Sequence, residues 1–147
     1  MIFRAAVRAD LPAILALLAD DRLGRARDSV VVDDAYERAF AAIAADPRNV
    51  VVVAERDGEV VGCLQVTYIP GLSRHGAERA LVESVRVRAD QRGQGVGAAF
   101  MAWVIDRARD RGCALVQLTT DKSRLAAQRF YAGLGFVASH EGLKLEL

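Results

Sequence analysis

The sequence predicts an α/β (α+β) fold in which a mixed, mostly antiparallel central sheet is flanked by helices. Runs of β-branched residues and segments of helical periodicity follow one another without a regular strand–helix alternation. Two strand-like runs, within "NVVVVAERDGEVVGCLQVTYIP", meet at Asp57-Gly58, a pair typical of a tight hairpin turn. The 147 residues, of which 52% are hydrophobic, suit one domain, and no repeat or low-complexity linker divides them. We therefore expect a single domain over residues 1–147.

The first part of the chain is expected to hold one short strand, "IFRAAV", and two helices. Asp10 is expected to cap the first helix, and Pro12 is tolerated in its first turn. The apolar residues of this helix recur at helical spacing: Leu11, Ile14, Leu15 and Leu18. The polar stretch "DDRLGRARDS" is expected to connect it to a second helix. That helix should end at Asp46, because a residue before proline disfavours helical geometry.

The part that follows the hairpin is expected to add strands and two more helices. "PGLSRHGAE" predicts a loop and "RALVESVRV" a strand, after which a glycine-rich stretch opens a helix that Gly112 ends. "CALVQLTTD" predicts another strand, "SRLAAQRFYAGL" another helix, and "GFVASHEGLKLEL" one or two closing strands.

Charge and cysteine content exclude several classes of protein. The formal net charge is +1, so no global basic field attracts nucleic acid. No segment approaches the roughly 18–20 apolar residues of a membrane span, and the acidic residues around the N-terminal apolar run argue against a signal peptide. Cys63 and Cys113 have no His or Cys partner at ligand spacing. We predict a cytoplasmic protein with reduced cysteines that binds no nucleic acid, membrane or metal ion.

The stretch "VRVRADQRGQGVG" places three glycines where a strand passes into a helix. Gly93, Gly95 and Gly97 let the backbone approach an anion closely. The first turn of the helix offers unpaired N–H groups and a partial positive charge, and arginines lie nearby. A phosphate-binding loop is therefore predicted. The alternative is an ordinary glycine-rich turn with solvated arginines.

Two known phosphate-binding motifs fit this stretch poorly. The Lys-Ser or Lys-Thr pair of a P-loop NTPase is absent. "GQGVGA" matches the dinucleotide fingerprint G-x-G-x-x-G/A, and Asp121 ends the next strand. However, only 26 residues follow Asp121, too few for the remaining strands of a dinucleotide-binding domain.

The stretch is instead similar to a signature of the GNAT superfamily of acyl-CoA-dependent N-acetyltransferases, R/Q-x-x-G-x-G/A. "RGQGVG" places Arg92, Gly95 and Gly97 at its marked positions. Downstream, "AAQRFYAGLGF" resembles the second motif of the superfamily, A-x-x-F-Y-x-x-x-G-F. The matching residues are Ala127, Phe130, Tyr131, Gly135 and Phe136. The spacing of the motifs and the order of the elements agree with the superfamily, so the resemblance covers essentially the whole chain and implies a GNAT-like acyltransferase fold.

The resemblance implies that the chain uses acetyl-CoA as cosubstrate. The loop amides would hold the pyrophosphate of coenzyme A, and these belong to Arg92, Gly93, Gln94, Gly95, Val96 and Gly97. The strand around Val85, Arg86 and Val87 would pair its backbone with the pantetheine amides. In the family a bulge splays this strand from its neighbour and opens a slot for the thioester. Arg124 stands where many members carry an asparagine that contacts the pantetheine arm, which leaves that contact open.

Glu83 and Tyr131 are the candidate catalytic residues. Glu83 is expected to share a strand face with Leu81, Val85 and Val87, and apolar surroundings make a carboxylate a stronger base. Many family members place a base here that acts directly or through water. The alternative is a carboxylate that is paired with an arginine or turned outward by the bulge. The family match makes Tyr131 the general acid toward the coenzyme A sulfur, and the alternative is a core aromatic residue with a hydrogen-bonded hydroxyl.

The acceptor is expected to be the primary amine of a small polar molecule, amino acid-like or anionic, which attacks the thioester directly. The segments 20–29 and 70–79 are expected to frame its entrance. Their charged residues are Arg22, Arg25, Arg27, Arg74, Arg79, Asp20, Asp21, Asp28 and Glu78. Guanidinium groups pair well with a carboxylate or phosphonate. The alternatives are a non-catalytic acyl-CoA-binding or sensing module and a protein or peptide N-acetyltransferase. Because family members often pair through exposed strands or helices, the resemblance also allows a homodimer.

Overall fold

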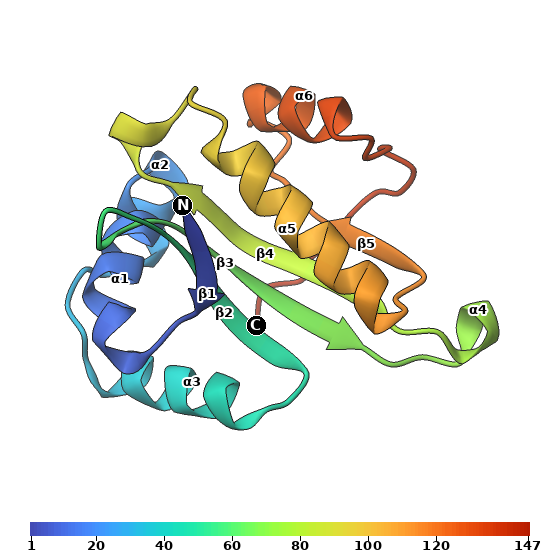
Figure 1. Cartoon of the computed structure of the whole chain (residues 1–147), viewed down its shortest axis with the longest axis horizontal. Coiled ribbons are helices and arrows are strands. Elements are labelled where there is room, and N and C mark those ends of the chain that lie inside the picture. Colours follow the sequence, from blue (N-terminus) through green and yellow to red (C-terminus); the bar gives the residue numbers. More distant parts are fainter. The chain divides into compact units, whose positions relative to one another are not determined.

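The computed structural model describes the backbone of residues 1–147 and every side chain except that of Arg22. The chain consists of two compact units, Met1–Gln117 and Leu118–Leu147, and each is described by itself. Figure 1 shows their helices and strands in the colours of the sequence. The single domain expected over residues 1–147 stays a prediction.

The first unit contains most of the secondary structure. Its elements are β1 (Ile2–Ala5), a 3-10 turn (Arg8–Asp10), α1 (Leu11–Ala19), α2 (Arg22–Arg27), α3 (Asp34–Ala45), β2 (Asn49–Arg56), β3 (Glu59–Ile69), α4 (Ser73–Gly76), β4 (Arg79–Val87), a second 3-10 turn (Ala89–Gln91) and α5 (Val96–Arg111). Strand β5 (Leu115–Leu118) begins in the first unit and ends at the unit boundary. The second unit contains helix α6 (Leu125–Gly133).

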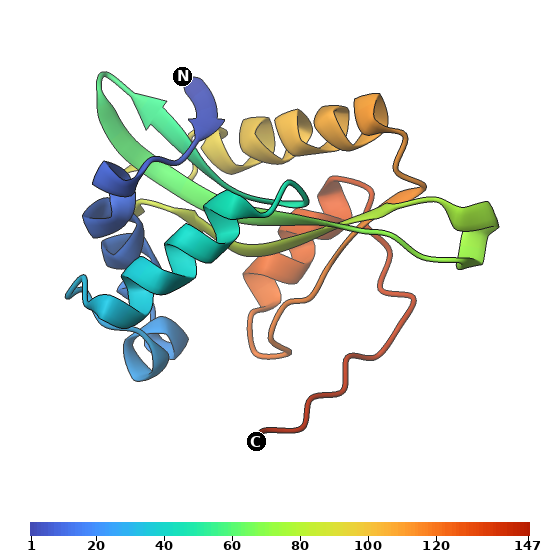
Figure 2. The same ribbon diagram turned by 90° about the horizontal axis from the view of Figure 1, so that it is seen from below.

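A five-stranded sheet in the order β1-β2-β3-β4-β5 confirms the predicted fold class. β1 with β2, β2 with β3 and β3 with β4 are antiparallel pairs. The predicted hairpin joins β2 and β3, with φ of 54° at Asp57 and 80° at Gly58, because a turn of two left-handed residues matches the twist of the strands. Within the first unit, Figure 2 shows α5 on one side of the sheet and α1 and α3 on the other.

The two faces of the sheet have separate apolar cores. On one face the ring of Phe3 in β1 stacks on Phe100 of α5, with centroids 5.0 Å apart. Phe100 is fully buried, while Trp103 is half-buried and also contacts Phe3. On the other face α1 packs on β2 and β3 through a buried cluster made of Ile14, Leu17, Val53 and Cys63. Helices α5 and α1 therefore stabilise the sheet by packing on its two faces.

Two local predictions for the first part of the chain are wrong. Asp10 does not cap α1 with its side chain. The 3-10 turn gives Asp10 itself helical geometry, and its carboxylate accepts hydrogen bonds from Arg4 (2.7 and 3.0 Å) and from the Val7 N–H (2.8 Å). The stretch expected as a connection contains α2, because the Asp21 carboxylate accepts from the Gly24 N–H and so caps this short helix.

The C-terminal closing strands are also absent from the chain as described, in which no strand follows Leu118. A strand needs a neighbour to pair its N–H and C=O groups. The other predicted boundaries hold closely: α3 ends at Ala45, β4 spans Arg79–Val87, and Gly112 ends α5 in the left-handed region at φ 84°. Among the described helices, none combines the length and apolar character that crossing a bilayer requires.

Candidate functional site

The glycine loop leads into α5 with several backbone N–H groups that have no acceptor in the described chain. Gly95 is the N-cap residue of α5, with φ 80° and ψ 0°, and Gly93 has φ 73°. A Cβ built at either glycine would meet no atom within 4 Å. No carbonyl or side chain among the described residues accepts from the N–H groups of residues 93–96. The N–H groups and the dipole of a helix N-terminus both favour an anion, so this geometry suits the predicted phosphate-binding loop, and phosphate binding itself stays a prediction.

Side chains brace the loop from the outside. The Arg92 guanidinium donates to the Val87 carbonyl (2.9 Å) and to the Asp20 carboxylate (3.1 Å), which ties the loop to β4 and to the end of α1. The Gln94 amide donates to the Asp90 carbonyl (2.8 Å). The loop thus keeps its conformation without a bound anion.

The predicted arginines beside the loop are each paired with a carboxylate. Arg88 lies between Asp90 (2.7 Å) and Glu59 (3.0 Å), and Arg92 is paired with Asp20 (3.1 Å). The hydrogen bond from Arg88 lowers the pKa of Asp90 to about 2, so this carboxylate stays charged at neutral pH. If the loop binds phosphate as predicted, the attraction therefore comes from backbone amides more than from free guanidinium groups.

Strand β4 contains the bulge that the family resemblance implies. Cys63 of β3 lies opposite Arg86, but Gln65 lies opposite Glu83, so β4 has one extra residue across from Leu64. Ser84, at the bulge, has φ 55°, a left-handed conformation that is uncommon for a residue with a Cβ. A bulge twists its strand and interrupts the regular ladder of hydrogen bonds. Here the Ser84 and Val85 carbonyls accept from the side chains of Cys63 (3.9 Å) and Arg86 (3.0 Å).

The bulge places Glu83 and Arg86 on one face of the sheet. In a regular strand, two residues three positions apart point to opposite faces. Here their partners Gln65 and Cys63 share a face, so Glu83 and Arg86 do too, while Val87, opposite Gly62, is on the other face. The expectation that Glu83 shares its face with Leu81 is confirmed, since Leu81 lies opposite Thr67. The expectation that it shares this face with Val87 is wrong, because the extra residue reverses the alternation, and the register gives Val85 no partner that would place it.

Glu83 is exposed and has polar neighbours along this face. The side chains of Gln65, which pairs with Glu83 across the ladder, and Thr67 both donate to the Asn49 side-chain oxygen, at 3.1 and 2.6 Å. No ion pair to Glu83 is found among the side chains that the structure describes. The carboxylate is open to a substrate or a water molecule, and its catalytic role stays a prediction.

Arg86 lies beside the bulge as a nearly buried cation. Its side chain is 14% exposed, and its Nε is 3.4 Å from the Asp21 carboxylate at the start of α2. The Nε is nevertheless buried without a hydrogen bond, while Nη1 donates to the Val85 carbonyl (3.0 Å). The pairing of the Arg86 backbone with the pantetheine arm stays a prediction. The Arg86 side chain points toward Asp21 at the α1–α2 junction.

Cys63, which lies opposite Arg86, is not a candidate nucleophile. Burial raises the pKa of its thiol to about 12, and Arg86 offsets this only in part. At neutral pH the thiolate that could accept an acyl group is therefore almost absent. This burial makes Cys63 poorly suited to carry an acyl group, and direct attack by the acceptor stays a prediction.

Tyr131 and Arg124 belong to the second unit. The Tyr131 ring packs edge-on against Phe130 and Phe136, with centroids 5.1 and 5.8 Å apart, and the residue is half-buried. Arg124 is the N-cap residue of α6, and its N–H donates to the Asp121 carbonyl (2.9 Å). Their roles toward coenzyme A stay predictions.

The residues expected at the acceptor entrance differ in their exposure and in whether their charges are already paired. Arg25, Arg27 and Arg74 are exposed, whereas Glu78 is engaged by Arg111 (2.8 Å) and Arg48 (3.7 Å). Asp20 and Asp21 are partners of Arg92 and Arg86. Asp28 and Arg79 are half-buried. The predicted role of the Arg22 side chain falls outside the described residues.

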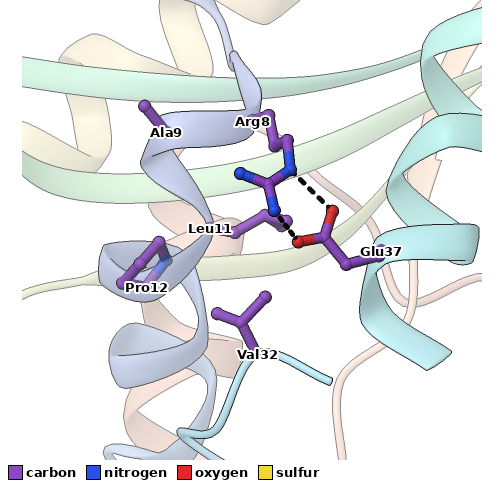
Figure 3. Close-up of a pocket in the computed structure, with 6 residues that line it drawn as sticks. All are labelled: Arg8, Ala9, Leu11, Pro12, Val32 and Glu37. Atoms are coloured by element: carbon purple, nitrogen blue, oxygen red, sulfur yellow. Dashed lines mark hydrogen bonds and ion pairs between the residues drawn. The ribbon is translucent and has the colours of Figure 1, made fainter. Parts of the chain in front are cut away.

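A pocket of about 300 Å³ lies away from these residues, between the beginnings of α1 and α3 (Figure 3). Its lining residues are Arg8, Ala9, Leu11, Pro12, Val32 and Glu37. Arg8 and Glu37 form a two-bond ion pair with each other. Their charges are therefore already satisfied, and we assign no ligand to this pocket.

Comparison with known proteins identifies relatives of the chain. Residues 12–136 match the model of the acetyltransferase (GNAT) family. The chain is 33% identical, over 72% of its length and 68% of the relative's, to aminoalkylphosphonate N-acetyltransferase of Salmonella typhimurium. It is 32% identical, over 89% of its length and 77% of the relative's, to L-methionine sulfoximine/L-methionine sulfone acetyltransferase of Pseudomonas paraeruginosa. A solved structure from Bacillus halodurans, described as a transcriptional regulator, shares 47% identity and a TM-score of 0.96 over 99% of both chains.

Proposed function

Since the chain belongs to the GNAT acetyltransferase family and is an N-acetyltransferase, we propose that it acetylates the primary amine of a small polar molecule that also bears an anionic group. Acetyl-CoA is the proposed acetyl donor, and the amine attacks it directly. The location that we propose is the cytoplasm, where acetyl-CoA is made and used. The absence of a metal from the reaction stays a prediction.

The glycine loop is the main observation in support of acetyl-CoA as the acetyl donor. Its N–H groups have no acceptor among the described residues, and the space at Gly93 and Gly95 is open, which fits the pyrophosphate of coenzyme A. The loop is already held by Arg92, so little ordering is required when the donor binds. The pantetheine arm is proposed to lie along the bulged part of β4, where the regular ladder with β3 is interrupted.

Two side chains are proposed to move the protons of the reaction. Glu83 takes a proton from the acceptor ammonium, directly or through a water molecule, so that the nitrogen lone pair attacks the thioester carbonyl. Tyr131 gives a proton to the coenzyme A sulfur as the carbon–sulfur bond breaks. The products are then the N-acetyl amine and the free thiol of coenzyme A.

Arg86 is proposed to hold the anionic group of the acceptor. It shares the sheet face of Glu83, and its buried Nε lacks a hydrogen bond. An aminoalkylphosphonate and an amino acid such as methionine sulfoximine both combine an amine with an anionic group, and these are the compounds in the names of the two relatives. A guanidinium pairs with either kind of anion through two parallel hydrogen bonds.

Two rival functions differ in measurable ways. A non-catalytic acyl-CoA sensor would bind acetyl-CoA without releasing thiol in the presence of any amine. A protein N-acetyltransferase would prefer peptides to free amines. Regulation through DNA binding is not our proposal, because the formal net charge of +1 provides no basic field.

The test is a panel of acceptors scored by release of free thiol from acetyl-CoA. It includes amino acids, aminophosphonates, polyamines, aminoglycosides, arylalkylamines and basic peptides. We expect the highest kcat/KM with amino acids or aminophosphonates. Turnover restricted to arylalkylamines, polyamines or peptides would refute the proposed acceptor, and binding without turnover on the whole panel would favour the sensor.

A further inference from the structure

A series of hydrogen-bonded side chains crosses the sheet face on which Glu83 lies. The Gln65 Nε2 donates to the Asn49 Oδ1 (3.1 Å), and the Thr67 hydroxyl donates to the same oxygen (2.6 Å). The Asn49 Nδ2 in turn donates to the carboxylate of Asp46, the C-cap residue of α3 (2.8 Å). In the register of β3 with β4, Gln65 lies directly opposite Glu83. The series therefore runs from the end of α3 to the neighbour of the proposed base.

The direction of each hydrogen bond between the amides follows from Asp46. An ionised carboxylate has no proton to donate, so Asn49 must turn its NH2 group toward Asp46 and its oxygen toward β3. That oxygen is an acceptor only, so Gln65 must turn its own NH2 group toward Asn49. The hydrogen bond from the Arg48 N–H lowers the pKa of Asp46, which keeps the carboxylate ionised at neutral pH. The Gln65 oxygen is thereby left over as an acceptor.

The Gln65 Oε1 is open to a ligand. No described group donates to it, and the buried side-chain polar atoms without a partner in the described chain are two arginine nitrogens, so Oε1 reaches solvent. Residues directly opposite each other in an antiparallel pair have Cβ atoms about 4.5–5.5 Å apart. An amide oxygen and the exposed carboxylate of Glu83 are therefore neighbours, and both can only accept when Glu83 is ionised.

We propose that Gln65 binds the ammonium group of the acceptor together with Glu83, an inference that rests on the proposed function. An ammonium group has several N–H donors and no acceptor, so it fits a site made of two acceptors. Glu83 takes one proton from the nitrogen. The amide oxygen of Gln65 is too weak a base to take a proton at neutral pH, so it keeps hold of a second N–H. The lone pair that forms on the nitrogen then has a fixed direction for attack on the thioester.

Asn49 and Asp46 are positioning residues in this scheme, because they act on the substrate only through Gln65. A glutamine without such partners can present either its oxygen or its NH2 group, and the NH2 group would repel an ammonium. The hydrogen bond to Asn49 removes that choice, and Asp46 sets the orientation of Asn49. The side chain of Gln65 is thus prepared for a cationic nitrogen before the acceptor arrives.

The experiment is isothermal titration calorimetry of the full chain with two probes, 2-aminoethylphosphonate and propylphosphonate, in the presence of coenzyme A so that no turnover occurs. The probes share the phosphonate and the chain length, and one ends in an ammonium group, the other in a methyl group. Gln65→Met keeps an unbranched side chain without the amide, and the Asn49 oxygen still accepts from Thr67. Gln65→Glu keeps an acceptor oxygen. Thr67→Val is the matched control, because it removes the other donor to Asn49 at a position opposite Leu81.

We expect Gln65→Met to weaken binding of 2-aminoethylphosphonate at least ~10-fold, since a hydrogen bond to a charged group is lost. Propylphosphonate should bind this variant as tightly as the wild type or more tightly, because its methyl group then meets an apolar side chain. Gln65→Glu should bind 2-aminoethylphosphonate no more weakly than the wild type, and Thr67→Val should change either Kd by less than ~3-fold. An unchanged Kd for acetyl-CoA and an unchanged circular dichroism spectrum would show that each variant is folded.

Four results would overturn the inference, and the last of them is distinct from the others. An unchanged Kd for 2-aminoethylphosphonate in folded Gln65→Met would mean that the ammonium does not contact Gln65. Equal losses for both probes, or equal losses in Gln65→Met and Gln65→Glu, would give Gln65 a structural role only. An equal loss in Thr67→Val would assign the effect to the network around Asn49 rather than to the Gln65 oxygen. A wild type that binds neither probe would refute the proposed acceptor itself, and this inference with it.

Discussion

Replacing Gly95 with aspartate separates the folding of the glycine loop from its binding of phosphate. Gly95 has φ 80°, and a left-handed conformation costs an ordinary residue about 1–2 kcal/mol, less for Asp and Asn. A carboxylate at this N-cap position can accept from N–H groups of the first turn of α5, which contributes about 1 kcal/mol. The new side chain meets no atom within 4 Å of its Cβ. The free energy of unfolding should therefore change by no more than about 1 kcal/mol.

The same substitution should strongly weaken binding of coenzyme A. The carboxylate would stand in the open space over the loop, within about 4 Å of a bound phosphate, where two like charges repel by about 1 kcal/mol in water and about 4 kcal/mol at an effective dielectric constant of 20. It would also occupy the N–H groups that the pyrophosphate needs. A loss of about 2–4 kcal/mol corresponds to a roughly 30- to 1,000-fold higher Kd.

Gly95→Asn is the matched control, because asparagine has the same shape and the same tolerance of left-handed geometry without the charge. Isothermal titration calorimetry with acetyl-CoA on Gly95→Asp, Gly95→Asn and the wild type gives the three Kd values, and thermal unfolding checks the fold. We expect Asn to weaken binding by less than about tenfold. A folded Gly95→Asp variant with the wild-type Kd would refute the phosphate assignment, and equal losses for Asn and Asp would refute its electrostatic part.

Four further substitutions test the remaining roles. Tyr131→Phe should keep the affinity for acetyl-CoA and lower kcat about 10²-fold; wild-type turnover would leave Tyr131 as a packing residue. Glu83→Gln should lower the rate near neutral pH and lose less at high pH, where the acceptor amine is already deprotonated; an equal loss at every pH would argue against proton removal. Arg86→Gln should reduce kcat/KM at least about tenfold for an aminoalkylphosphonate, with little change for a neutral amine of equal length; equal losses would give Arg86 a structural role only. Asp10→Asn should lower the free energy of unfolding by about 2 kcal/mol near pH 7. The hydrogen bond from Arg4 lowers the pKa of Asp10 in the folded state. In urea titrations, the extra stability of the wild type should therefore be fully present above the unfolded-state pKa of about 3.9 and be lost as the pH falls from there through the lower folded-state pKa. A constant difference at all pH values would contradict this.

Elements with strong periodicity or unambiguous turn residues were predictable from the sequence. The hairpin at Asp57-Gly58 and the end of α5 at Gly112 follow from residues that tolerate positive φ. The glycine loop was predictable for the same reason. Helix α2 was not, because its start depends on one side-chain hydrogen bond from the Gly24 N–H to Asp21 inside a polar stretch. Such a cap is common at turns too, so the pattern favours neither outcome.

The C-terminal segment shows a different limit of sequence reasoning. Its alternation is that of a strand, and the strand prediction is wrong only because no strand partner lies beside it in the described chain. The alternation of apolar and polar residues predicts which conformation a segment favours. Whether the segment pairs into a sheet depends on which other strands lie next to it in the fold. The ion pairs of Arg4 with Asp10 and Glu55 are of the same kind, since they join residues that only the fold brings together.

The bulge in β4 is the feature on which the candidate site in the first unit most depends, and it has the weakest sequence signal. Ser84 takes the left-handed conformation at φ 55° without being a glycine, so the residue type does not reveal it. Conformations of this kind cost on the order of 1 kcal/mol or more and persist where the surrounding structure enforces them. Here the extra residue brings the Glu83 carboxylate and the Arg86 guanidinium to one face. A strand without it would separate the proposed base from the proposed anion contact by the thickness of the sheet. The left-handed conformation of Ser84 thus accounts for why the two side chains that we propose to contact the acceptor share a face.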